Sequence, residues 1–151
     1  MSENTRLVWN EVAPQGAKAL FSIHHYIMTS TNLPHELIQL VFLRTSQING
    51  CAHCIDLHTR DLLTTMPLEK VVLLPVWAEV PHLFSDQYRA ALAWAEEVTL
   101  VSETHASDAA YAAVSAAFAP KDLVDLTIAI AAMNAFNRLG VPFRLPVKAE
   151  A

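Results

Sequence analysis

The chain has 151 residues, of which 53% are hydrophobic and 17% charged, and its formal net charge is −5. This length fits a single domain spanning residues 1–151, and the hydrophobic share excludes an intrinsically disordered chain. The acidic balance provides no basic surface for nucleic acid or anionic lipid, and three glycines leave no phosphate-binding glycine loop. No apolar run approaches the ~18 residues of a membrane-spanning helix, and the polar N-terminus does not resemble a signal peptide, so we expect a cytoplasmic protein.

Hydrophobic residues recur at helical spacing along the chain, and few stretches alternate as a half-buried strand would. Pro14 and Pro120 stand where helices start, Ser85 and Ser107 are expected N-caps, and Gly140 is expected to stop the last helix. The predicted helices cover residues 14–28, 34–48, 51–64, 68–74, 85–101, 107–118 and 120–139. A loosely held tail is expected to follow them over residues 141–151. The sequence thus predicts an all-α fold of six or seven helices.

The last predicted helix is apolar nearly all round, which is typical of a helix buried in a large core or at a subunit interface. The low share of charged residues also leaves few charges to cover the surface of a monomer. We therefore expect a homo-oligomer. Trp94 and Phe136 are interpreted as packing residues of the core or of a subunit interface.

A pair of cysteines and a histidine share one helical face. Cys51 and Cys54 are three residues apart, and His58 follows Cys54 by four, so all three converge within the first two turns of a helix. The N-terminus of a helix favours a thiolate, and a nearby histidine can take the thiol proton. An activated thiolate, a proton carrier and a second thiol are what a two-electron thiol peroxidase or reductase requires.

Other interpretations of the two cysteines remain open at this point. Zinc binds Cys-x-x-Cys, with His58 as a third ligand, but a fourth would have to come from His24, His25 or elsewhere. The cysteines could also be inert core residues, or could report redox state without catalysis. Covalent haem is excluded because Ile55 stands where that motif needs histidine, and a thioredoxin-like site because a helix, not a strand, precedes the motif.

The sequence Ser-Gln-Ile-Asn-Gly-Cys-Ala-His-Cys-Ile-Asp-Leu-His-Thr at residues 46–59 resembles the core motif of the AhpD-like alkylhydroperoxidase family, within the carboxymuconolactone decarboxylase superfamily. The likeness extends upstream and downstream, and residues 126–139 resemble the closing helix of that family. The resemblance implies an all-α AhpD-like fold that assembles as trimers or hexamers. It also implies an oxidoreductase that reduces hydrogen peroxide or organic hydroperoxides through a disulfide.

The resemblance also assigns roles to individual residues. It implies that Cys54 is the attacking thiol, Cys51 the resolving thiol and His58 the proton relay, while His53 matches a histidine that some members carry between the cysteines. No metal or organic cofactor is implied. The expected partners are a hydroperoxide substrate and a reductant, either a dithiol protein or a small thiol.

One position departs from the family pattern. Many members carry a glutamate twelve residues before the first cysteine, at the far end of the proton relay, and here that position is Gln39. A neutral amide can orient His58 but cannot exchange a proton near neutral pH. Glu36 lies one helical turn earlier and is a candidate substitute, although a glutamate there also suits the N-terminus of a helix by its charge alone.

Overall fold

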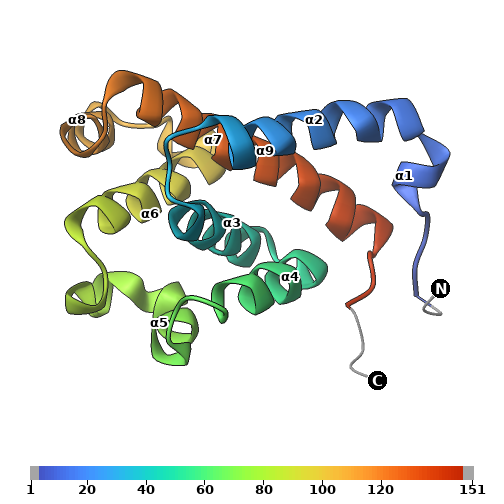
Figure 1. The fold of residues 1–151 in the computed structure, drawn as a ribbon, viewed down its shortest axis with the longest axis horizontal. Helices are drawn as coiled ribbons and strands as arrows, with labels where there is room; N and C mark the ends of the chain where they lie inside the picture. Colours follow the sequence, from blue (N-terminus) through green and yellow to red (C-terminus); the bar gives the residue numbers. More distant parts are fainter. Residues whose placement is uncertain (1–3, 148–151) are drawn as a thin grey trace.

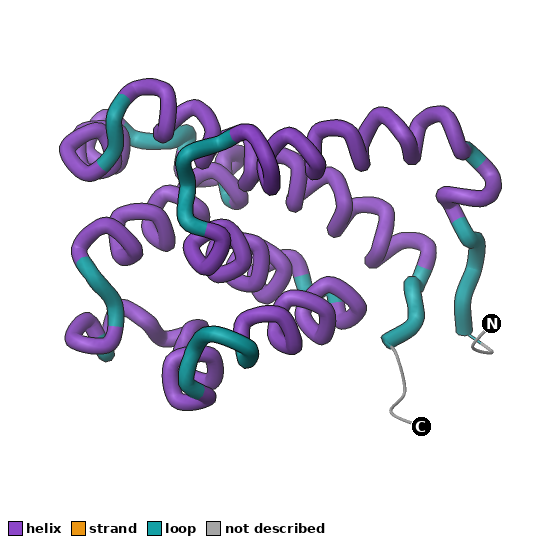
Figure 2. Tube along the Cα trace, in the orientation of Figure 1, coloured by secondary structure: helices purple, strands orange, loops and turns teal. Residues whose placement is uncertain are grey.

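The computed structural model describes residues 4–147, and within them the regular structure is helical, with no strand (Figures 1 and 2). The helices are α1 (Trp9–Val12), α2 (Pro14–Ser30), α3 (His35–Asn49), α4 (Ala52–Leu62), α5 (Leu68–Leu73), η1 (Leu74–Glu79), η2 (Pro81–Leu83), α6 (Asp86–Thr99), α7 (Val101–Thr104), α8 (Asp108–Ala117) and α9 (Pro120–Phe143). The all-α prediction is confirmed. All seven expected helices are present, and α1 and α7 were missed because four residues show no periodicity.

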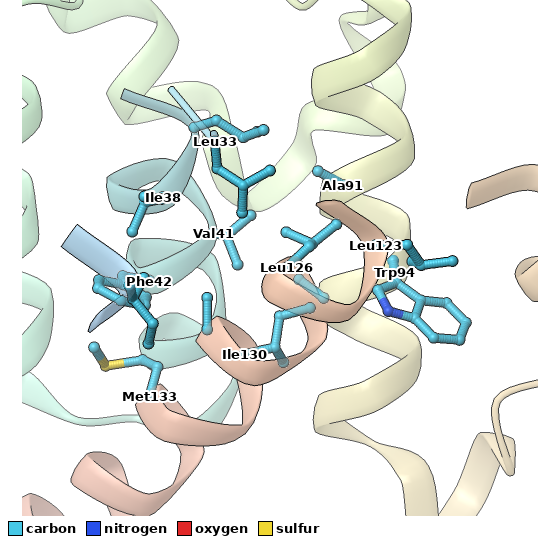
Figure 3. Close-up of a cluster of buried hydrophobic side chains, with 14 of the residues drawn as sticks. Leu33, Ile38, Val41, Phe42, Ala91, Trp94, Leu123, Leu126, Ile130 and Met133 are labelled. Carbon is cyan, nitrogen blue, oxygen red and sulfur yellow. The ribbon is translucent and has the colours of Figure 1, made fainter. Parts of the chain in front are cut away.

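Helix α3 occupies the centre of the fold and packs against α4, α6 and α9. The larger core cluster joins α3 to α6 and α9, and Figure 3 shows Phe42, Leu126 and Ile130 converging there. A second cluster, which includes Leu40 and Leu74, packs the remaining side of α3 against α5 and the 3-10 helices. Because α3 is buried on most of its surface, the polar side chains that it carries must find partners inside the protein.

The expected caps form, except at the end of the last helix. Ser85 accepts a hydrogen bond from the backbone N–H of Tyr88, and Ser107 accepts one from Ala110. Gly140 does not stop α9, which continues to Phe143 and ends at Arg144 in the left-handed conformation. The prediction of a stop at Gly140 was therefore wrong, because this glycine serves the close packing of α9 against Cys51.

The first and last described segments meet at one end of the molecule (Figure 1). The backbone N–H of Arg6 donates to the carbonyl of Phe143 at 3.0 Å, and the guanidinium of Arg144 donates to the Asn4 side chain at 2.8 Å. The expectation of a loosely held tail over 141–151 is therefore wrong for residues 141–147, while 148–151 lie outside the described part of the chain. Among residues 4–147, no helix is both long enough and apolar enough to cross a lipid bilayer.

Candidate active site

The turn between α3 and α4 places the first cysteine at a helix N-terminus. Gly50 ends α3 with φ +68°, a backbone conformation that glycine adopts without strain. Cys51 follows as the N-cap of α4, where its sulfur accepts a hydrogen bond from the backbone N–H of Cys54 at 3.4 Å. An N-cap sulfur faces the positive end of the helix dipole, which favours the thiolate form of Cys51 when the protein is reduced.

Cys51 and Cys54 are joined by a disulfide, with their Cα atoms 5.3 Å apart. Both residues are buried: Cys51 is 1% exposed and Cys54 5%. The two sulfurs can therefore bond to each other without unfolding of α4. In residues 4–147 no group of three or more His, Cys, Asp or Glu side chains is placed to hold a metal ion, so the structure gives no support to the zinc interpretation.

Helix α9 provides the surface against which the disulfide packs. A β-carbon built at Gly140 would lie 2.8 Å from the Cys51 sulfur and 3.5 Å from the Cys54 sulfur. The first distance is too short for a real carbon–sulfur contact, so glycine at this position is required by the close approach of α9 to the disulfide. Gly140 is thus part of the site and lies inside the helix that it was expected to end.

Side-chain amides fix the α3–α4 turn onto α9. The Asn49 side chain donates to the side-chain oxygen of Asn137 at 2.9 Å and to that of Asn134 at 3.0 Å. The Asn137 amide in turn donates to the hydroxyl of Ser46 at 3.1 Å. These bonds tie the residues just before the cysteines to the helix that carries Gly140, so the position of the disulfide depends on both helices.

His58 and Gln39 form the polar part of the site. His58 is 5% exposed, and its Nδ1 lies 2.8 Å from the Oε1 of Gln39 on α3. Since a carbonyl oxygen can only accept, Nδ1 carries the proton in this pair and Nε2 is left as the basic nitrogen. Burial lowers the pKa of His58 to about 4, and the nearby His24 and His53 lower it in the same direction. His58 is therefore neutral at pH 7.

Glu36 does not take part in this arrangement. Its carboxylate accepts a hydrogen bond from the Tyr88 hydroxyl at 3.3 Å, which ties α3 to α6. Burial, together with the charge and hydrogen bond of Glu36, raises the pKa of Tyr88 above its ordinary value. The structure brings together Cys51, Cys54, His58 and Gln39, and it engages Glu36 elsewhere.

Cys54, rather than Cys51, lines the cavities beside the disulfide. One cavity, of about 100 Å³, is lined by Cys54, His58 and His24, with Phe21, Phe136 and Met133 completing the wall. A neighbouring cavity of about 260 Å³ shares Cys54, Phe21 and Phe136, and is closed by residues that include Trp9 and Leu145. Of the two cysteines, Cys54 is therefore the one that a small molecule in these cavities would meet.

The C-terminal segment lies beside the same cavities. The His53 ring nitrogen Nδ1 lies 2.6 Å from the carbonyl oxygen of Pro146, and the backbone N–H of Leu145 donates to the carbonyl of Gly140 at 3.0 Å. His53 thus anchors residues 145–146 next to the cysteines. His53 also lines the larger of the two cavities.

Sequence reasoning missed several residues of the site. Phe136 was interpreted as core or interface packing, but it lines both cavities, whereas Trp94 is buried in the core as expected. Trp9 was given no role at the site, and His24 was named only as a possible fourth ligand to zinc. Only Gly140 carried a usable signal, because a glycine in a helical pattern often marks a close approach of another group.

The chain matches one protein family and is similar to an uncharacterized bacterial protein. Residues 14–97 match the model of the carboxymuconolactone decarboxylase family. The uncharacterized protein YdfG of Bacillus subtilis is 31% identical over 137 residues, which cover 90% of this chain and 92% of that protein.

Two solved structures are informative in different ways. A protein of unknown function from Agrobacterium tumefaciens, described as a candidate antioxidant defence protein AhpD, is 36% identical, with a TM-score of 0.92 over 97% of this chain and 99% of that one. The debrominase Bmp8 is 18% identical, with a TM-score of 0.78 over 92% of this chain and 74% of that one. At that identity the second likeness concerns the fold alone.

Proposed function

The chain belongs to the carboxymuconolactone decarboxylase family and is AhpD-like, and on that premise we propose that it is a thiol peroxidase acting on hydrogen peroxide or organic hydroperoxides. The observation that carries the proposal is the joint placement of Cys54 and His58 in one cavity, with Cys51 within disulfide distance of Cys54. This arrangement combines a reachable nucleophile, a base and a resolving thiol.

The reduced enzyme would work through two steps. The Cys54 thiol passes its proton to Nε2 of His58, and the thiolate attacks the terminal peroxide oxygen. The O–O bond breaks, Cys54 becomes a sulfenic acid, and the departing alkoxide takes the proton from His58 to leave as an alcohol. The Cys51 thiol then attacks the sulfenic sulfur, which releases water and forms the disulfide. The sum is ROOH + 2 RSH → ROH + H₂O + disulfide.

An external dithiol, either a protein or a small molecule, would restore the two thiols. The reductant would attack the sulfur of Cys54, which lines the cavity, and Cys51 would leave as a thiolate. The hydrogen bond from the backbone N–H of Cys54 to the Cys51 sulfur stabilises that thiolate, and so does the dipole of α4. Cys51 is therefore the better leaving group. Gln39 accepts the Nδ1 proton of His58, keeps Nε2 free to take up and release the transferred proton, and is a positioning residue.

The test combines intact mass with turnover. One equivalent of hydroperoxide should remove two hydrogen atoms from the reduced protein, and dithiothreitol should sustain peroxide consumption. Cys54→Ser should abolish turnover, whereas Cys51→Ser should still form a sulfenic acid, detected as one added oxygen atom. Full turnover in the Cys54→Ser variant would rule out the mechanism.

Aromatic side chains in the cavity favour a second candidate function, the reductive dehalogenation of an aromatic substrate. The same dithiol would supply two electrons, so that ArBr + 2 RSH → ArH + Br⁻ + H⁺ + disulfide. Bromide release from a brominated phenol or pyrrole in the presence of dithiothreitol would support this function, and its absence alongside peroxide turnover would exclude it.

We also propose that the protein is a homo-oligomer. Large apolar side chains are exposed on several helices: Leu68 and Val72 are each 62% exposed, and Val124 57%. An apolar groove of about 460 Å³ between α6, α8 and α9, which includes Tyr111 and Val124, offers a surface that a second copy could cover. Light scattering on the protein as it elutes from a size-exclusion column should give a molar mass that is two or more times 16.7 kDa. The mass of a monomer would reject this proposal.

A further inference from the structure

The rings of Trp9, Phe21 and Phe136 form an aromatic wall in the larger cavity beside Cys54. The Trp9 and Phe21 rings are stacked with centroids 5.9 Å apart, and Phe136 lies 5.6 Å from Phe21 and 6.5 Å from Trp9. The ring of His24 meets Phe136 edge-on at 6.2 Å. Phe21 and Phe136 line both cavities that share Cys54, Trp9 lines the larger one and His24 the smaller, so a ring bound in the larger cavity lies against Trp9, Phe21 and Phe136.

This aromatic wall depends on parts of the chain outside the family match. Trp9 stands in the short helix α1, and Phe136 in α9, whereas the family match covers residues 14–97. The hydrogen bonds of Arg6 and Arg144 between the two terminal segments place α1 beside the end of α9. Two of the three rings, those of Trp9 and Phe136, therefore lie outside the matched segment, while Phe21 and both cysteines lie within it.

The lining of the two cavities offers no permanently charged partner to a charged group. No Asp, Glu, Lys or Arg lines either cavity, and the most buried histidine of the site, His58, is neutral at pH 7. Phe21 is 50% exposed, so a ring packed against it removes apolar surface from water. Planar rings gain offset or edge-to-face contacts with such a wall that aliphatic groups of similar size do not.

We propose that the aromatic wall makes the enzyme selective for uncharged hydroperoxides that carry an aromatic ring, and that Trp9 is the residue that determines this specificity. The inference rests on the proposed peroxidase function and names its substrate class. The ring of the substrate lies among Trp9, Phe21 and Phe136, and its peroxide group is directed at the sulfur of Cys54. Trp9 contributes binding of the ring and takes no part in the proton transfers.

Two hydroperoxides that differ by one group test the specificity. Cumene hydroperoxide is tert-butyl hydroperoxide with one methyl replaced by a phenyl ring. The kcat/KM of the wild type should be about tenfold higher for cumene hydroperoxide, a factor that corresponds to one or two aromatic contacts. In Trp9→Ala that ratio should fall to near one, while Trp9→Phe should keep most of it.

Val12→Ala is the matched control, because Val12 stands in the same helix α1, is 68% exposed and does not line the cavities. Its ratio should equal that of the wild type. A wild-type ratio near one, or an unchanged ratio in Trp9→Ala, would overturn the proposal. Phe21→Ala, at a half-exposed position that tolerates truncation, should lower the ratio in the same way if Trp9→Ala fails to fold.

A binding measurement separates this inference from the proposed function. The product 2-phenyl-2-propanol should bind the disulfide form in NMR titrations about fivefold more tightly than tert-butanol, and Trp9→Ala should remove the difference. If the ring binds in this way but no hydroperoxide is reduced, the peroxidase proposal fails and the ring specificity of the cavity stands. If hydroperoxides are reduced but the two alcohols bind equally, the specificity fails alone.

Discussion

Replacing Gln39 by glutamate should make the enzyme faster near neutral pH. Gln39 accepts the Nδ1 proton of His58 at 2.8 Å, and the buried imidazole has a pKa of about 4. Proton transfer from a thiol of ordinary pKa, about 8.5, to an imidazole of pKa about 4 is uphill by about 4.5 pH units, or about 6 kcal/mol at about 1.36 kcal/mol per unit.

A carboxylate at position 39 would stabilise the imidazolium form of His58. An opposite charge within about 4–6 Å typically moves a pKa by about one to three pH units. A rise of about two units in the pKa of His58 would increase the population of the thiolate–imidazolium pair about 100-fold. Position 39 is only 4% exposed, and the cost of burying the new carboxylate offsets part of this gain. We expect kcat/KM at pH 7 to rise at least about tenfold.

The assay pairs kinetics with a direct titration of His58. Rates with hydrogen peroxide would be measured in wild type and Gln39→Glu at pH 7, and the pKa of His58 would be followed by NMR in both proteins. Gln15→Glu, an exposed position on α2, adds the same charge without contacting His58 and should leave the rate unchanged.

Two results would refute the reasoning. An unmoved His58 pKa in Gln39→Glu would show that the residue at position 39 does not control the imidazole. A raised pKa without a faster rate would show that the basicity of His58 does not limit turnover.

Two further predictions concern stability. Because the pKa of His58 is lowered to about 4, the unfolded chain binds a proton below about pH 6.5 that the folded protein does not bind. The free energy of unfolding should therefore fall by about 3 kcal/mol for this group as the pH drops from about 6.5 to 4. Urea titrations should show that the free energy of unfolding depends less steeply on pH in His58→Gln than in the wild type, and an equal pH dependence in the two proteins would contradict the shift. Gly140→Ala should destabilise the disulfide form by about 1–3 kcal/mol, because its β-carbon would collide with the Cys51 sulfur. Gly16→Ala, with nothing within 4 Å of the new methyl, should be neutral or stabilising by up to about 1 kcal/mol, and equal urea midpoints for the two variants would remove the packing argument for Gly140.

Local patterns were sufficient for the seven expected helices and for the core of the site. Helical periodicity and the caps at Ser85 and Ser107 depend on residues within a few positions of one another, so they could be predicted from the sequence. The convergence of Cys51, Cys54 and His58 is equally local, because all three lie at or within the first turns of α4. The presence of Gln39 in place of glutamate was also visible, and the structure added its contact with His58 across α3 and α4.

Contacts between distant segments could not be predicted from the same patterns. The sequence left Glu36 and Gln39 as alternatives because both fit one helical face, and only the packing of α6 against α3 assigned Glu36 to Tyr88. A glycine such as Gly140 often marks the end of a helix, but here it is needed because a sulfur packs against it. That sulfur belongs to a residue 89 positions earlier in the chain. The aromatic wall likewise joins Trp9, Phe21 and Phe136 from three different helices.

The sequence by itself determined the class of the protein, which is a helical chain with two thiols and an imidazole on one face of a helix. It could do so because a helix with 3.6 residues per turn brings positions 51, 54 and 58 together in any setting. Only the tertiary structure decided which sulfur a substrate can reach, which partner holds His58 and what surrounds the cavity. Those properties depend on the approach of α1, α2, α3 and α9 to α4, and contacts across such sequence separations are set by the packing of the whole core.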